Sequence, residues 1–198
     1  MDLQKSRKGK CSLKRRKLTI IFGFVLIALV LSFSFFKSRY TDDADKAAAK
    51  IIETCSRYNI DVTFYPEEKK VTALEKVTIT NNSADDLQEL YFHLYPNALK
   101  MPDEVPFPRE EISRAYPEGF APGYINIKKI MLESDEADYE IDDTILKVNL
   151  NEPFKPNQKL TLTFEFEAQI PPSYGRFGYG QNTYNIANWY SILEVYDD

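Results

Sequence analysis

The alternation of apolar and polar residues predicts that most of this chain is β-structure. In residues 159–170, every second residue from Leu160 to Ile170 is apolar, and the residues between them are polar. A period of two places these side chains on opposite faces of a strand, so one face packs and the other meets water. Shorter alternating runs predict further strands at residues 60–65, 71–80, 90–95, 124–132, 139–141 and 144–150. Their spacing predicts a mainly β, mostly antiparallel domain of about 140 residues.

The alternation lapses between Lys100 and Gly123, where five prolines occur. Proline removes a backbone donor and fixes φ, so this stretch is expected to be a long loop with one helical turn near residues 110–115. Polar turns are predicted at residues 81–83 and 142–143, and the apolar residues of 190–196 predict one last strand.

A different pattern occurs near the N-terminus. Nineteen residues without a charge, Leu18–Phe36, follow eight Lys and Arg residues. A helix of that length rises roughly 28 Å, enough to cross a bilayer, and the positive-inside rule places the basic end in the cytoplasm. A cleaved signal peptide is the alternative, but the charged residues that follow make a poor cleavage site. We therefore expect a single-pass signal anchor in the cell membrane with an extracellular body.

These patterns predict four parts. Residues 1–17 are a basic cytoplasmic segment, 18–36 a transmembrane anchor, 37–57 a linker with a short helix, and 58–198 a β domain. Charge follows the same division, because residues 1–39 hold ten Lys and Arg with one Asp, whereas residues 40–198 hold fifteen Lys and Arg with twenty-nine Asp and Glu. The acidic body argues against nucleic acid as a partner.

Candidate chemistry is sparse. The chain has one histidine, His93, while zinc hydrolysis on a helix uses two histidines and a glutamate. His93 is therefore expected to be structural. The two cysteines, Cys11 and Cys55, fall on opposite sides of the predicted membrane, and Cys55 is expected to be a half-buried helix residue. Glu165 and Glu167 are expected on the solvated face of their strand. No catalytic residue, metal ligand or cofactor is predicted in this chain.

The densest surface signal is the aromatic- and glycine-rich end of the chain, residues 174–198. Its tyrosines and Trp189 could close the end of the domain. They could equally form a platform for a peptide, a sugar or another domain.

Two stretches carry a family resemblance: YNIDVTFYPEEKKVTALEKVTITNNSADDLQELYFHLYPNAL, residues 58–99, and GRFGYGQNTYNIANWYSILEVYDD, residues 175–198. Together they resemble the N-terminal β domain of bacterial, membrane-anchored M1-family zinc aminopeptidases, the gluzincins. The resemblance implies a saddle-like β-sandwich that packs against a thermolysin-like catalytic domain. That catalytic domain would carry the H-E-x-x-H helix and the zinc, and this sequence contains no such motif.

The resemblance also implies a location for site residues, since the family's β domain contributes to the rim of the substrate cleft. In this chain the corresponding residues would be Gln181, Asn182 and Trp189. The expected function is a non-catalytic accessory domain, truncated at its junction with a catalytic domain and inactive by itself. A catalytic partner on a separate chain, a stand-alone tethered module that binds a peptide or other ligand, and a regulatory subunit remain alternatives.

Overall fold

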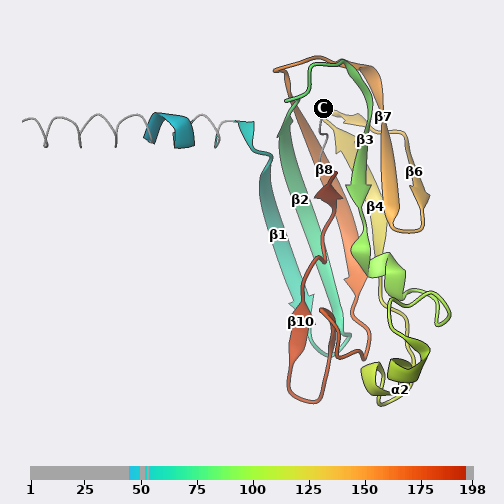
Figure 1. Cartoon of the computed structure of the whole chain (residues 1–198). Coiled ribbons are helices and arrows are strands. Elements are labelled where there is room, and N and C mark those ends of the chain that lie inside the picture. The colour runs from blue at the N-terminus through green and yellow to red at the C-terminus, as the bar shows by residue number, and fades with distance from the viewer. Residues whose placement is uncertain (1–44, 50–51, 53, 195–198) are drawn as a thin grey trace, which may run out of the picture. The chain divides into compact units, whose positions relative to one another are not determined.

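The computed structural model describes residues 45–49, 52 and 54–194 (Figure 1). The chain divides into two compact units, Met1–Glu53 and Thr54–Asp198. In the first unit the described residues, 45–49 and 52, are helical. No helix in the described part of the chain combines the length and apolar character needed to cross a membrane, and the predicted anchor Leu18–Phe36 lies outside that part.

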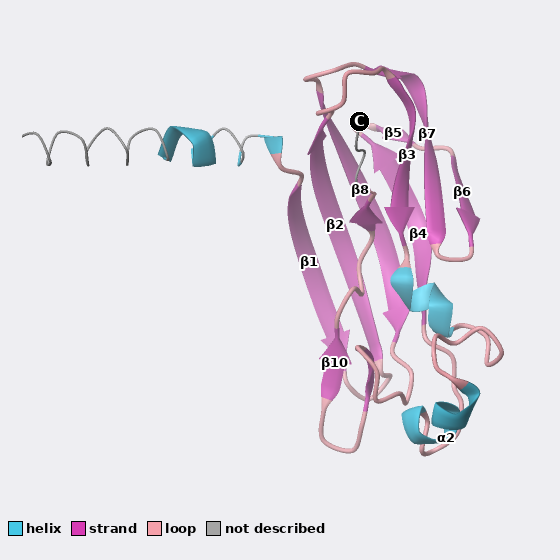
Figure 2. Cartoon of the chain, in the orientation of Figure 1, coloured by secondary structure: helices cyan, strands magenta, loops and turns pink. Residues whose placement is uncertain are grey.

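The second unit is mainly β and antiparallel, as the alternation predicted (Figure 2). A five-stranded sheet has the order β1-β2-β8-β4-β5, and a four-stranded sheet has the order β11-β3-β7-β6. The strands of the first sheet are β1 (Arg57–Tyr65), β2 (Lys70–Thr80), β8 (Lys159–Gln169), β4 (Tyr124–Leu132) and β5 (Asp135–Glu136). Those of the second are β11 (Ile192–Leu193), β3 (Leu87–His93), β7 (Ile145–Phe154) and β6 (Tyr139–Asp142). A separate hairpin pairs β9 (Phe177–Tyr179) with β10 (Tyr184–Ile186).

Strand β8 lies at the centre of the five-stranded sheet because both of its edges pair with another strand. It pairs with β2 in an unbroken register from Lys159 to Gln169, and with β4 on its other side. Its alternate residues Leu162, Phe164 and Phe166 are fully buried. The ring of Phe164 meets that of Phe92 on β3 with 4.9 Å between centroids, so the two sheets pack face to face. We call the face of the five-stranded sheet that carries Phe164 its inner face.

The proline-rich stretch forms a long loop with short helices, as expected. Helix η1 (Tyr95–Leu99) follows β3, and η2 (Arg109–Glu111) runs directly into α2 (Ile112–Ala115). The buried side chain of Asn97 ties this region to the sheets, donating to the carbonyl of Asp143 at 2.8 Å and accepting from the amide of Ile125 at 3.0 Å.

Two local expectations were wrong. Cys55 is exposed and follows the helical residue Thr54, so it is not a half-buried helix residue. Strand β7 runs on to Phe154, beyond the predicted end at residue 150, because Phe154 still pairs with Leu87 across a register shift in β3. Only Ile192 and Leu193 of the predicted last strand are paired among the described residues, and residues 195–198 lie outside them.

Candidate interaction surface of the C-terminal segment

The C-terminal segment, residues 171–194, lies along the inner face of β1 and β2 and then joins the four-stranded sheet (Figure 1). Its last strand, β11, pairs with β3, with Ile192 opposite His93. On the way Trp189 packs against Phe166 at 6.0 Å between ring centroids, and Tyr190 packs edge-on against Tyr58 at 5.5 Å. The segment therefore closes the open side of the sandwich between β1 and β3.

A buried carboxylate anchors the middle of this segment. The alternation of β2 points Val71, Ala73, Glu75 and Val77 to the inner face, and Glu75 is 0% exposed. Its Oε2 accepts hydrogen bonds from the Ser191 amide at 3.1 Å and from the Ser191 hydroxyl at 2.7 Å. Its Oε1 has no hydrogen-bond partner among the described residues.

The electrostatics of Glu75 follow from this geometry. Burial disfavours the charged form and raises the pKa of Glu75 to about 7, although both hydrogen bonds from Ser191 act to lower it. Beside it, the Tyr58 hydroxyl accepts a hydrogen bond from the Leu193 amide at 3.0 Å. Burial is the largest cause that raises the pKa of Tyr58, and the charge of Glu75 adds to it. The anchor is thus polar and buried, and its protonation changes near neutral pH.

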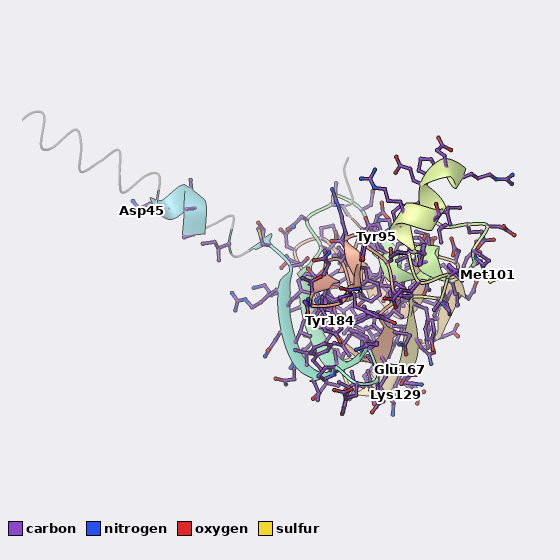
Figure 3. All side chains as sticks on the ribbon, turned by 90° about the horizontal axis from the view of Figure 1, so that it is seen from below. Asp45, Tyr95, Met101, Lys129, Glu167 and Tyr184 are labelled. Carbon is purple, nitrogen blue, oxygen red and sulfur yellow. The ribbon has the colours of Figure 1, made fainter. Side chains whose placement is uncertain are left out.

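A second anchor holds the hairpin end of the segment. Lys69 Nζ donates to the Tyr184 hydroxyl at 2.8 Å, and that hydroxyl donates to the Pro66 carbonyl at 3.0 Å. The ammonium also lies 5.2 Å from the centroid of the Tyr179 ring, and Phe64 meets Tyr184 edge-on at 4.9 Å. The hydrogen bond to Tyr184 raises the pKa of Lys69, so the ammonium stays charged there. Figure 3 shows Tyr184 beside β1, while Glu167 and Lys129 of the outer face lie away from Tyr95.

Glycine is required where the segment turns back on itself. A Cβ at Gly178 would lie 1.9 Å from the carbonyl oxygen of Ser173, closer than any side chain allows. The β9–β10 hairpin therefore depends on a residue without a side chain at this point.

The three predicted site residues lie in two places. Gln181 and Asn182 are exposed in the turn between β9 and β10, and Gln181 borders a hollow of about 200 Å³. Lys69, Glu118, Tyr174 and Tyr179 also line that hollow. Trp189 is instead half-buried against Phe166 and Tyr190, within the packing of the segment. The hairpin turn therefore presents Gln181 and Asn182 together, and Trp189 supports the segment that carries them.

Sequence reasoning missed Glu75 and Lys69. Glu75 did leave a signal, because it occupies an inward position in the alternating run from Val71 to Ile79, where only apolar residues are expected. Lys69 left none, since its role depends on Tyr184, which is 115 residues away.

The residues that could have suggested chemistry have structural contacts. His93 Nε2 lies 2.7 Å from Glu194 Oε2, and its ring stacks on Tyr95 at 4.9 Å, as expected of a structural histidine. Glu165 is exposed, and Glu167 on the same outer face accepts from Lys128 at 2.7 Å. Throughout the described ranges, no group of three or more His, Cys, Asp or Glu side chains could hold a metal ion, so these residues do not fit a zinc site.

No family model matches the chain, and no curated protein matches it. Among solved structures it is similar to M1 zinc metallopeptidases. One is the M1 zinc metallopeptidase from Deinococcus radiodurans, with 11% identity and a TM-score of 0.39 over 57% of this chain and 20% of that one. A variant of that protein bound to a Tyr-ser-ala substrate matches with the same values. A two-domain M1 zinc metallopeptidase variant bound to L-tryptophan matches at 11% identity and a TM-score of 0.39, over 19% of its length. The chain spans about a fifth of the length of these proteins.

Proposed function

We propose that this chain is a non-catalytic accessory domain that acts by contact, as the saddle-like N-terminal β domain of a membrane-anchored M1-like metallopeptidase does. The exposed turn of the β9–β10 hairpin, with Gln181 and Asn182, is the contact surface. Its partner is a catalytic domain bearing the zinc, or a peptide bound between the two. Tethering through Leu18–Phe36, with the body outside the cell, belongs to the same proposal.

The observation that carries this proposal is the way the C-terminal segment is held. Two polar anchors fix the segment at separate points, Lys69 with Tyr184 at the turn between β1 and β2, and Glu75 with Ser191 on the inner face. Between β9 and β10 the turn is left exposed. A loop held on a rigid sheet loses little conformational entropy on binding, which is the property of a recognition surface.

The proposal can be tested by site-specific photocrosslinking in the cells that encode the chain. The full chain would carry p-benzoylphenylalanine at Gln181 or, as control, at Glu140, an exposed residue of β6. We expect Gln181 to yield an adduct whose mass-spectrometric identity is a protein with an H-E-x-x-H motif, and Glu140 to yield none. Adducts only to proteins without that motif would favour the stand-alone binding module, and no adduct at Gln181 would refute the contact surface.

A second measurement addresses the absence of catalysis. The purified full chain in detergent, incubated with leucine p-nitroanilide, is expected to show no turnover with or without added Zn²⁺. Zinc-dependent turnover that copurifies with the chain would contradict a non-catalytic role.

A further inference from the structure

Strand β1 is a long edge strand, and its side away from β2 pairs with no other described strand. It pairs with β2 along all nine residues from Arg57 to Tyr65. At about 3.4 Å per residue, it presents roughly 30 Å of backbone with donors and acceptors directed outward. Figure 1 shows β1 at the margin of the domain.

The other edges of the two larger sheets carry the usual protection against pairing. At the opposite edge of the same sheet, β5 has two residues, and β4 is interrupted by a register shift between Ile127 and Lys129, with Lys128 exposed. In the second sheet β11 pairs with only two residues of β3, and β3 has a register shift between Leu87 and Glu89. At the other edge of that sheet, the four-residue β6 exposes Glu140 and Asp142. Short strands, bulges and charges all discourage edge-to-edge association.

Strand β1 has fewer of these devices, since Arg57 and Asp61 are its only charged residues. Its register with β2 is unbroken, and it contains no proline, glycine or lysine. On the inner face Val62 is 51% exposed and Phe64 is 40% exposed. On the outer face Tyr65 is 38% exposed. Val62, Phe64 and Tyr65 thus flank the open edge on both faces, where one further strand would pack against them.

The sequence of β1 is compatible with a second copy of itself. A twofold axis perpendicular to the sheet makes the two copies of β1 antiparallel and keeps both inner faces on one side. Directly opposite side chains then lie on the same face, so the axis must pass between two copies of the same residue. An axis at Asp61 would oppose two carboxylates, and an axis at Thr63 would set Arg57 across from Lys69. An axis at Val62 avoids both repulsions. It opposes Ile60 to Phe64, Asp61 to Thr63, and Arg57 to Glu67 of the turn that follows.

We propose that β1 is a homodimerisation edge, at which two copies pair antiparallel about Val62 and join their sheets into one continuous sheet. Each dimer gains one Val62–Val62 contact, two Ile60–Phe64 contacts and two Arg57–Glu67 pairs. This interface is distinct from the β9–β10 turn, and it goes beyond the proposed accessory function.

Disulfide trapping tests the proposed register. In the full chain in detergent, with Cys11→Ser and Cys55→Ser as background, Val62→Cys places two thiols directly opposite each other. Leu74→Cys is the matched control, since Leu74 is 48% exposed and lies on the neighbouring strand. Mild oxidation is expected to convert most of the Val62→Cys chain to a covalent dimer and little of the Leu74→Cys chain. Equal trapping at both positions, or none at position 62, would overturn the proposal.

Sedimentation of the otherwise unchanged full chain supplies an independent test at exposed residues, whose replacement leaves the fold intact. Arg57→Glu or Glu67→Arg alone is expected to weaken dimerisation roughly 5-fold, because two surface ion pairs are lost per dimer, and the double reversal is expected to restore it. A monomer at every concentration tested would refute the dimer. Single reversals without effect, or a double variant as weak as the singles, would refute the Val62 register.

Discussion

The inner face of the five-stranded sheet is covered in two different ways. Over β8 and β4 it packs against β3 and β7, and Phe164, Phe92, Ile130 and Leu146 are fully buried there. We call this the sandwich half. Over β1 and β2 it is covered by the C-terminal segment, with Glu75 buried and Val62 exposed. We call this the segment half.

The difference shows what each kind of cover requires. The backbone donors and acceptors of a regular strand are satisfied by its neighbours in the sheet. The sandwich half can therefore be held by apolar packing alone. Most of the C-terminal segment is irregular, and its backbone needs partners from elsewhere. Glu75 supplies one for the Ser191 amide, and Tyr58 supplies one for the Leu193 amide. Polar anchors therefore replace apolar packing where a loop covers a sheet.

The largest effect is expected in the sandwich half. Phe164→Ala leaves a cavity between the sheets and should lower the free energy of unfolding by about 3–5 kcal/mol. Chemical denaturation followed by tryptophan fluorescence measures this loss. A loss below about 1 kcal/mol would show that the two sheets do not form the main core.

The second-largest effect is expected in the segment half, where the contribution of Glu75 to the free energy of unfolding should depend on pH. Because the folded pKa of Glu75 is raised to about 7, the folded protein binds a proton more tightly than the unfolded chain does. The penalty of burying the carboxylate is fully present above pH 7 and disappears as pH falls toward the unfolded value. Glu75→Gln removes the charge and should stabilise the protein at pH 8 by up to about 3 kcal/mol, and by little at pH 5.

The measurement is the free energy of unfolding of the wild type and of Glu75→Gln across this pH range. The difference between the two proteins at each pH removes the contribution of the other carboxylates, which both share. A constant difference between the wild type and Glu75→Gln at all pH values would contradict a raised pKa at this site.

Removing the Ser191 hydroxyl, which donates to Glu75, should have a smaller effect on the free energy of unfolding. Ser191→Ala deletes the 2.7 Å hydrogen bond to Glu75 but keeps the one from the backbone amide. We expect a loss of about 1–2 kcal/mol, because the bond joins a buried carboxylate. Amide hydrogen exchange should speed up at residues 189–193 more than at Phe164. Uniform acceleration across both halves would show that Ser191 does not act locally.

The smallest effect is expected at the surface pair near the end of the segment. His93 and Glu194 are partly exposed, with side-chain exposures of 24% and 43%. Glu194→Gln should therefore change the free energy of unfolding by only about 0.2–1 kcal/mol. Thermal unfolding at low and high salt measures it, and a loss equal to that of Ser191→Ala would place a main anchor here.

Local patterning by itself determined most of the regular structure. The two-residue period of residues 159–170 identified β8, and the same signal located β4 with its observed bounds, Tyr124–Leu132. The helical turn near residues 110–115 also followed from local composition. These features depend on neighbours within a few residues, so a linear sequence contains them.

Tertiary structure decided which faces are covered. The alternation of Ile60, Val62 and Phe64 is as regular as that of β8, yet β1 lies at an edge and two of these side chains remain exposed. Glu75 is an anchor only because Ser191, 116 residues away, returns to it. Trp189 supports the segment, and Gln181 with Asn182 is presented by it, because the chain folds back between β10 and β11. Periodicity specifies the two faces of a strand, but only the arrangement of distant segments determines what each face meets.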